Sequence, residues 1–226
     1  MLQPLSTSGA APSAGLGSLT DMIVSGGPVM IPIGLCSVVA LAYTIERALQ
    51  LRRGPLGLAE LGGEIVQVVR AGGRQRALEL CAAKPSPLAR VLSSALARWS
   101  EPPLEREKAV EDAGLREVRR LSAGLRPLVV VTAIAPLLGL LGTVWGMILA
   151  FSTVARAEGL GRPELLADGI SQALITTAAG LVIAIPTQAA YFWLKGRIER
   201  FARAAEDLYG ELAAALESAE GGRAHP

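Results

Sequence analysis

The chain has 226 residues, of which 51% are hydrophobic and 19% charged, and its formal net charge is +2. Such an apolar share is typical of a membrane protein. The nearly balanced charge gives no sign of the excess of Lys and Arg that nucleic-acid binding requires. The sequence has one histidine (His225) and two cysteines, and it contains no CxxC, HExxH, P-loop or GxSxG motif. It therefore shows no pattern typical of a metal site, a cofactor site or a catalytic residue. We therefore expect no enzyme. Cys36 lies in an apolar run and Cys81 in a polar region, so no disulfide is expected between them.

Residues 1–21 are rich in Ser, Gly, Ala and Pro and contain no Lys or Arg, so they lack the basic start of a signal peptide and predict a flexible leader. Residues 22–46 predict the first transmembrane helix. Its uncharged part is about 24 residues long, which is enough to cross a bilayer. Glycines and prolines in its first half favour a regular helix from about Pro28 onward, and Glu46, Arg47, Arg52 and Arg53 are expected to end it.

Residues 47–126 are polar and predict a helical region outside the membrane. Breaks are expected at Gly62–Gly63, Gly72–Gly73 and Pro85–Ser86–Pro87. The charge mixture near its end is typical of a solvated helix face, not of a binding patch. Helical spacing of apolar residues covers three segments, which are Arg74–Ala83, Leu88–Trp99 and Leu104–Arg120.

Residues 127–155 carry no charge and predict the second transmembrane helix. Pro136 removes one backbone hydrogen bond and predicts a kink. Gly142 and Gly146 have the GxxxG spacing that permits close contact between membrane helices. At helical spacing one side of this span is small or hydroxyl-bearing, and it comprises Thr132, Ala135, Gly139, Gly142, Thr143, Gly146 and Ala150.

Residues 156–168 predict a short polar connection, and residues 169–194 predict the third transmembrane helix, which begins GISQALITTAAGLVIAIP and has a second predicted kink at Pro186. Tyr191, Phe192 and Trp193 are typical of an interfacial belt. Residues 195–220 predict a helical extension, and residues 221–226 a tail. One side of the span is again small and polar, and it comprises Gly169, Ala173, Thr176, Thr177, Gly180, Ala184 and Thr187.

The two small faces admit two interpretations. They either pack against each other directly or line a narrow path for water or an ion, and residues of this kind alone favour packing. Arginines gather after the first and third spans, whereas the leader has none. The positive-inside rule therefore predicts a periplasmic N-terminus and places residues 47–126 and the C-terminus in the cytoplasm.

Two segments carry a family resemblance. APLLGLLGTVWGMILAF (Ala135–Phe151) and GISQALITTAAGLVIAIP (Gly169–Pro186) resemble the MotA/TolQ/ExbB proton-channel family, most closely its ExbB/TolQ branch, and LCAAKPSPLARVLSSAL (Leu80–Leu96) resembles it more weakly. With the order of the spans, the resemblance extends from Met22 to about Ala219. It implies an all-α, polytopic protein of the bacterial inner membrane with three transmembrane helices and a helical cytoplasmic domain.

The resemblance also implies assembly and partners. Family members form a ring, typically a homopentamer, around single helices of an ExbD/TolR/MotB-type partner that supplies an intramembrane Asp. The second and third spans line the pore, and the proton-motive force drives work on the cell envelope. A TonB/TolA-like or gliding component is a further expected partner, while no nucleic acid is expected.

The pore threonines of the family fall on Thr143 and Thr177, with Thr176 and Gln172 beside them on the expected ion path. Their hydroxyls are expected to bond the charged form of a partner carboxylate and so set its pKa. The resemblance assigns a further group of small residues to close passage of the partner helix, namely Gly139, Gly142, Gly146, Ala173 and Gly180.

Gln172 departs from the family pattern, which usually has a glutamate at this position. Glutamine forms hydrogen bonds but does not titrate. The chain has no Asp, Glu, Lys, Arg or His between Pro127 and Ala155 or between Gly169 and Leu194, so a titrating group must come from a partner, or the path must use water and hydroxyls.

Two hypotheses follow: a subunit of a proton-driven motor or energy transducer, and a ring-forming membrane scaffold without ion flux. A membrane enzyme is a weaker third, because no catalytic constellation appears. The work performed is open among outer-membrane transport, envelope maintenance, and surface or gliding motility, with a flagellar stator ranked lower because the cytoplasmic insert is short.

Overall fold

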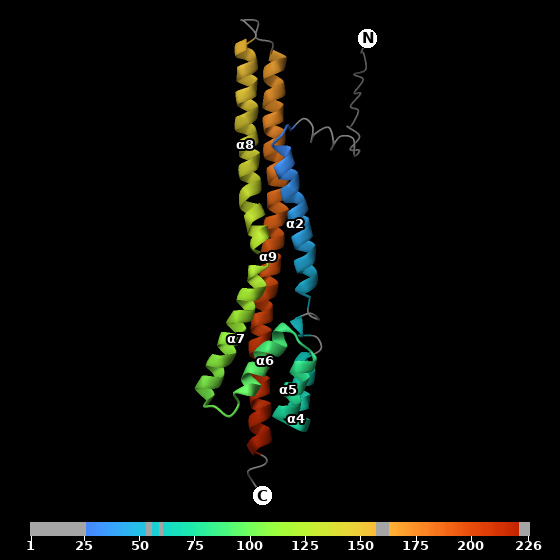
Figure 1. The fold of residues 1–226 in the computed structure, drawn as a ribbon, viewed down its shortest axis with the longest axis vertical. Coiled ribbons are helices and arrows are strands. Elements are labelled where there is room, and N and C mark those ends of the chain that lie inside the picture. The colour runs from blue at the N-terminus through green and yellow to red at the C-terminus, as the bar shows by residue number, and fades with distance from the viewer. Residues whose placement is uncertain (1–25, 53–55, 59–60, 157–162, 222–226) are drawn as a thin grey trace, which may run out of the picture. The chain divides into compact units, whose positions relative to one another are not determined.

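The computed structural model describes residues 26–52, 56–58, 61–156 and 163–221. The predicted leader (1–21), the first four residues of the first predicted span, residues 157–162 of the predicted connection and nearly all of the tail lie outside the described residues. The described elements are all helices (Figure 1), in the order α2 (Met30–Gln50), α4 (Leu61–Gly72), α5 (Arg74–Ala83), α6 (Pro87–Ala97), α7 (Pro103–Ala123), α8 (Arg126–Arg156) and α9 (Pro163–Gly221). The prediction of an all-helical chain is confirmed for the described residues.

Three helical stretches are long and apolar enough to cross a membrane, as the sequence predicts. They are α2, the stretch that contains α8, and the apolar half of α9. In α2 only 11% of the most apolar stretch of 18 residues is buried inside the chain. The corresponding share is 28% in each of the other two helical stretches. Apolar side chains this exposed need lipid or another subunit around them.

The end of α2 differs from the prediction. The helix continues through Glu46 and Arg47 to Gln50, because charge ends an apolar segment but does not break backbone hydrogen bonding. Side-chain bonds one turn apart support this last turn. The Gln50 amide donates to Glu46 at 2.9 Å, and Arg47 donates to the Gln50 oxygen at 2.6 Å.

The predicted break at Gly62–Gly63 is wrong, since both residues lie within α4. Tertiary packing outweighs the low helix propensity of glycine here. Leu61, Ile65 and Val69 are buried on one side of α4, and a Cβ at Gly62 would lie 3.1 Å from the side chain of Leu208. Gly73 and the segment before Pro87 do separate helices. Ser86 caps α6 by accepting a hydrogen bond from the Ala89 amide.

The third predicted span and its extension form one helix of 59 residues, from Pro163 to Gly221. The helix begins earlier than the sequence predicts, because residues 163–168 are helical and not part of a connection. Proline is well tolerated in the first turn of a helix, where its missing N–H has no partner to lose.

The described residues form two compact units. The first comprises residues up to Ser37 together with Ala133–Ala184, and the second comprises Val38–Thr132 and the chain from Ile185 onward. The second unit has the larger apolar core. Side chains from α4, α6 and α9 fill it, including Ile65, Leu88, Leu92, Leu96, Leu194, Ile198, Phe201 and Leu212.

Two charged residues of α7, Arg106 and Glu117, are buried, although the charge mixture of this segment predicts a solvated helix face. Glu117 accepts two hydrogen bonds of 2.7 Å from the Arg90 guanidinium of α6. The guanidinium of Arg106 lies 3.9 Å from the ring centroid of Trp99. A paired or stacked charge can leave the surface because these contacts offset part of the lost hydration.

We predict that Cys81, in α5, reacts as a high-pKa thiol in the folded protein. Burial raises the pKa of the Cys81 thiol to about 11, because the thiolate loses hydration there. In a Cys36→Ser background, alkylation by iodoacetamide should therefore stay slow at pH 8 and accelerate up to about pH 11. Protein unfolded in detergent is the control, and its rate should level off at least one pH unit earlier, near the ordinary thiol pKa of about 8.5. Coincident pH profiles would contradict the prediction.

Candidate functional site

The small faces of α8 and α9 pack directly against each other within the first unit. A Cβ at Gly139 would lie 3.1 Å from the Thr177 Cα, and one at Gly180 would lie 2.6 Å from the Ala135 carbonyl oxygen. A Cβ at Gly146 would lie 3.0 Å from the Gly169 carbonyl oxygen. The absence of a side chain is therefore what lets the two backbones meet. In the structure the two small faces pack directly against each other, which is the first of the two interpretations given for them.

This contact includes most of the small residues identified from the sequence. Gly142 faces Thr176, where an added Cβ would collide with the threonine side chain, and Ala173 lies against Gly146. Ala135, Ala173 and Thr176 are nearly inaccessible. Because this face is already occupied by the chain's own helices, its expected role beside a partner helix stays a prediction.

The hydroxyls of the predicted ion path donate to backbone carbonyls. Thr177 Oγ1 donates across the helix contact to the Gly139 oxygen at 3.1 Å. Thr143 Oγ1 donates to the Leu140 oxygen at 2.6 Å, and Thr176 Oγ1 donates to the Ala173 oxygen at 2.8 Å. Each hydroxyl oxygen keeps lone pairs that can accept a hydrogen bond. In this arrangement the hydroxyls of Thr143 and Thr177 suit a donor, such as water or a protonated acid, better than a carboxylate, whereas Thr176 is buried in the helix contact.

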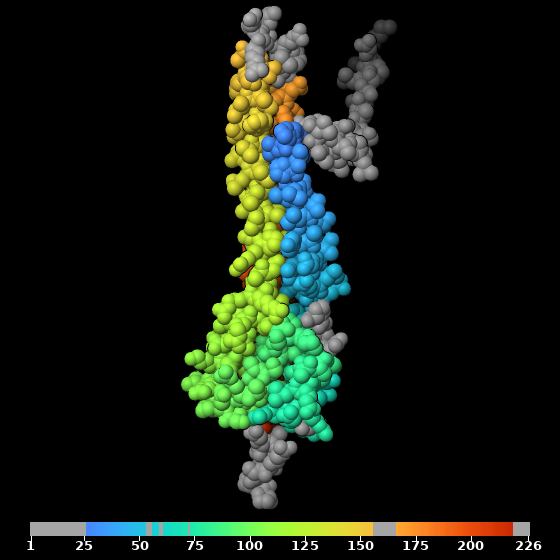
Figure 2. Space-filling view, viewed as in Figure 1, coloured from blue at the N-terminus to red at the C-terminus, as the bar shows by residue number. Residues whose placement is uncertain are grey.

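Thr143 lies apart from the other two threonines. It lines a shallow, mainly apolar groove formed along α8 alone, together with Val144, Met147, Ile148 and Phe151. The surrounding α8 surface is rich in exposed apolar side chains, among them Leu140, Val144 and Ile148. Figure 2 shows the broad outer surface of α8 in yellow. The structure therefore joins Thr176 and Thr177 in one helix contact and leaves Thr143 on an open face.

Gln172 lies between a turn and a cavity. Gly27 has a left-handed backbone with φ of +71°, and a Cβ there would collide with the Gln172 amide. Glycine is thus required at Gly27 for two reasons, its conformation and the close approach of Gln172. The side chain of Gln172 also lines a cavity of about 450 Å³, so it combines a packing contact with access to a polar space.

This cavity brings together residues that sequence reasoning assigned to different segments. Ala150 and Thr153 come from α8, while Ser171 and Gln172 come from the polar start of the third span. Asp168 also lines it, and this residue was missed because the sequence places it in a connecting loop. The signal that identifies it is its spacing, since it lies four residues before Gln172 and so on the same side of a helix.

Pro136 lies inside α8 and Pro186 inside α9, and both helices are continuous through them. Each proline lacks the N–H that would bond the carbonyl four residues earlier. The division between the two units falls close to both, after Thr132 and after Ala184. The predicted kinks stay predictions.

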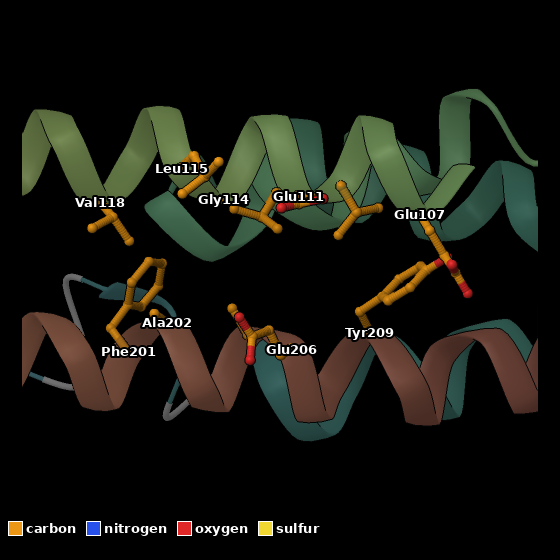
Figure 3. Close-up of a pocket in the computed structure, with 12 residues that line it drawn as sticks. Glu107, Glu111, Gly114, Leu115, Val118, Phe201, Ala202, Glu206 and Tyr209 are labelled. Carbon is orange, nitrogen blue, oxygen red and sulfur yellow. The ribbon is translucent and has the colours of Figure 1, made fainter. Parts of the chain in front are cut away.

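A second concave surface lies in the other unit, between α7 and α9, and encloses about 260 Å³ (Figure 3). Phe201 and Tyr209 point from α9 toward α7, Val118 faces Phe201, and Leu115 also lines the groove. Burial raises the pKa of the Tyr209 phenol. Glu107, Glu111 and Glu206 add carboxylates to this groove. Its chemistry suits an apolar segment that carries positive charge.

Among the described residues no group of three or more His, Cys, Asp or Glu side chains gathers as a metal site. The site is thus composed of hydroxyls, an amide, a carboxylate and a glycine-lined helix contact.

Comparisons with known proteins agree on one family. The sequence model of the "MotA/TolQ/ExbB proton channel family" matches residues 83–207. The chain is 30% identical to a putative biopolymer transport protein ExbB homolog of Methanothermobacter thermautotrophicus, over 81% of this chain and 65% of that relative. It is 36% identical to the biopolymer transport protein exbB1 of Vibrio cholerae, over 70% of this chain and 71% of that protein.

A third relative belongs to another system. The Tol-Pal system protein TolQ of Haemophilus influenzae is 37% identical over 46% of this chain and 44% of its own length. The chain thus spans a little under two thirds of the Methanothermobacter relative and less than half of TolQ.

We predict that Gly180→Ala separates α8 from α9 and destabilises the protein by about 1–3 kcal/mol, the usual range for overpacking. The methyl group would meet a backbone carbonyl, which cannot rotate away. Thermal unfolding in detergent, followed by circular dichroism, measures the effect.

The matched control for this change is Gly34→Ala in α2. Its Cβ would have no atom within 4 Å, and alanine favours a helix by up to about 1 kcal/mol relative to glycine. Equal unfolding temperatures for the two variants would show that the helix contact tolerates a side chain at Gly180.

Proposed function

Since the chain belongs to the MotA/TolQ/ExbB proton channel family, we propose that it forms a ring, expected to be a homopentamer, around the helix of an ExbD/TolR-like partner and couples proton flow to work on the cell envelope. The family and the three apolar helices make it a multi-pass membrane protein with a role in energy transduction. The ring, the partner and the process are the proposal.

The observation that carries this proposal is the polar, glycine-lined contact between α8 and α9 inside segments that are otherwise apolar. Thr176 is 1% exposed there, and the Thr177 hydroxyl bonds the backbone of the other helix. Polar groups within a membrane span are costly and usually serve packing or an ion path. The same contact opens onto a cavity lined by Thr153, Ser171 and Gln172.

In the proposed cycle the partner supplies an acidic side chain that alternates between its protonated and its ionised form. When that acid is protonated, its O–H can donate to the lone pairs of Thr177 or Thr143, whose own protons bond backbone carbonyls. When it is ionised, water in the ring must hydrate it. One transferred proton supplies about 2.3 kcal/mol per 100 mV of membrane potential, so a few protons can drive a conformational step.

The proposed location is the inner membrane of a bacterium, with the N-terminus in the periplasm and the C-terminus in the cytoplasm. The support is the charge distribution, since Lys195, Arg197, Arg200 and Arg203 follow the third span closely. The guanidinium of Arg197 lies 4.5 Å from the ring centroid of Trp193. Stacking of a cation on an exposed Trp fits the boundary between lipid and water.

We propose the envelope process that this protein powers only as far as the ExbB/TolQ branch indicates it. The names of the relatives point to biopolymer transport and to the Tol-Pal system, which correspond to outer-membrane transport and envelope maintenance, while gliding motility is a third candidate. A TonB/TolA-like or gliding component would be the next partner in each case.

A second candidate function is a ring-forming scaffold without ion flux of its own. One observation favours it: the hydroxyls of Thr143 and Thr176 are both satisfied by their own helices, which is what purely structural threonines do. The non-titrating Gln172 is consistent with the same function.

We predict that Thr177→Val lowers proton flux at least tenfold. Valine keeps the shape of threonine but removes the acceptor and the bond to Gly139. The complex would be purified from its native membranes with its bound partner, reconstituted in liposomes that contain a pH-sensitive dye, and driven by a potassium-diffusion potential. Thr132→Val is the control, because the Thr132 hydroxyl bonds Val129 on its own helix and lies outside the expected path.

Three results decide between the candidates. Flux in the wild-type complex that falls in Thr177→Val but not in Thr132→Val supports the proton path. An intact complex with no flux supports the scaffold. Equal flux in all three proteins removes Thr177 from the mechanism.

A further inference from the structure

Among the described residues that line the cavity beside Gln172, one has an ionisable side chain. Its described lining consists of Leu149, Ala150, Thr153, Asp168, Gly169, Ser171 and Gln172, and of these only Asp168 can carry a charge. The other polar groups are two hydroxyls and one amide. A carboxylate surrounded by neutral polar groups in a cavity of about 450 Å³ has room for water beside it.

Asp168 and Gln172 are four residues apart in α9, so their side chains lie on one side of the helix, about 5–6 Å apart at Cβ. Gln172 is held against the backbone at Gly27. Asp168 is exposed and forms no hydrogen bond or ion pair with the residues that the structure describes. Its carboxylate is therefore available to a mobile ligand, whereas the amide one turn later is already in contact with protein.

The position of this acid along the chain is also distinctive. No Asp, Glu, Lys, Arg or His occurs from Pro127 to Ala155 or from Gly169 to Leu194. Asp168 directly precedes the uncharged part of the third span and begins the row of residues four apart that continues through Gln172, Thr176 and Gly180, so it borders the small face. A proton that enters along this face meets the Asp168 carboxylate before it meets any hydroxyl of the helix contact.

We propose that Asp168 is the proton-loading group of this subunit and that it performs, one helical turn earlier, the ionisable role that Gln172 cannot. The proposal rests on the proposed function. The Asp168 carboxylate accepts a proton from hydronium, and a water molecule is released. The resulting carboxylic acid then passes its proton through cavity water to the ionised acid of the partner and returns to the carboxylate. Gln172 orders that water through its amide.

Charge at this position has a physical rationale. A carboxylate at the entrance raises the local concentration of protons and other cations, while a neutral amide deeper in the span avoids the cost of a permanent charge there. The same chemistry predicts exchange between the two positions: a chain that carries the acid at residue 172 needs none at residue 168.

The test uses the purified complex with its bound partner in liposomes, and its readout is proton flux. Asp168→Asn keeps the size of the side chain and removes its charge, so flux should fall about tenfold while assembly, measured by native mass spectrometry, stays the same. Asp168→Glu should retain most of the flux. The double variant Asp168→Asn with Gln172→Glu should recover at least half of the wild-type value, and a merely structural role of Asp168 would not produce that rescue.

Asp112→Asn is the matched control, since Asp112 is an exposed aspartate of α7 in the other unit. If Asp168→Asn does not assemble, Asp168→Ser is the second way to remove the charge, with the same expected loss of flux and the same rescue.

The results separate this inference from the function on which it rests. Normal flux in Asp168→Asn or Asp168→Ser, with flux still lost in Thr177→Val, overturns the role of Asp168 and leaves the proton path standing. Failure of the Gln172→Glu rescue overturns the exchange of positions. Absence of flux in the wild-type complex overturns both the inference and the proposed function.

Discussion

The close contact between α8 and α9 is the constraint on which the first unit depends. Lipid is as apolar as leucine, so two helices in a membrane gain little by hiding apolar side chains from it. They gain instead from dense van der Waals contact, which requires that backbones approach closely. Gly139, Gly142, Gly146 and Gly180 make that approach possible, and the bond from Thr177 to the Gly139 carbonyl adds a fixed point.

This contact also determines where polar chemistry remains available. Thr176 is enclosed by the helix pair and bonds its own helix, so it serves the contact first. Thr143 stays on the open face of α8, and Asp168 and Gln172 line the cavity where the contact ends. A neighbouring backbone or side chain already covers Gly139, Gly142 and Thr176, whereas Thr143 and Gln172 keep an open side, and the proposed ion path depends on these open sides.

The second unit is stabilised mainly by the burial of apolar side chains and not by close contact between backbones. Its core buries large aliphatic side chains of α4, α6 and α9 away from water, and its few buried charges are offset by partners, as between Arg90 and Glu117. Here the hydrophobic effect operates fully. A single helix, α9, contributes to both units, so its residues change from Gly, Ala and Thr before Pro186 to large apolar and charged residues after it.

The sequence by itself determined the all-helical class, the three apolar segments, the family, and the small faces of the second and third spans, because composition, hydropathy and helical spacing are local properties. Only the tertiary structure decided that Gly62–Gly63 is helical, that Arg106 and Glu117 are buried, and that Asp168 belongs with Gln172. Each of these depends on contacts between residues distant along the chain or on where a helix begins. Glycine propensity, charge patterning and loop composition do not encode those contacts, since packing energy outweighs a local preference of about 1 kcal/mol.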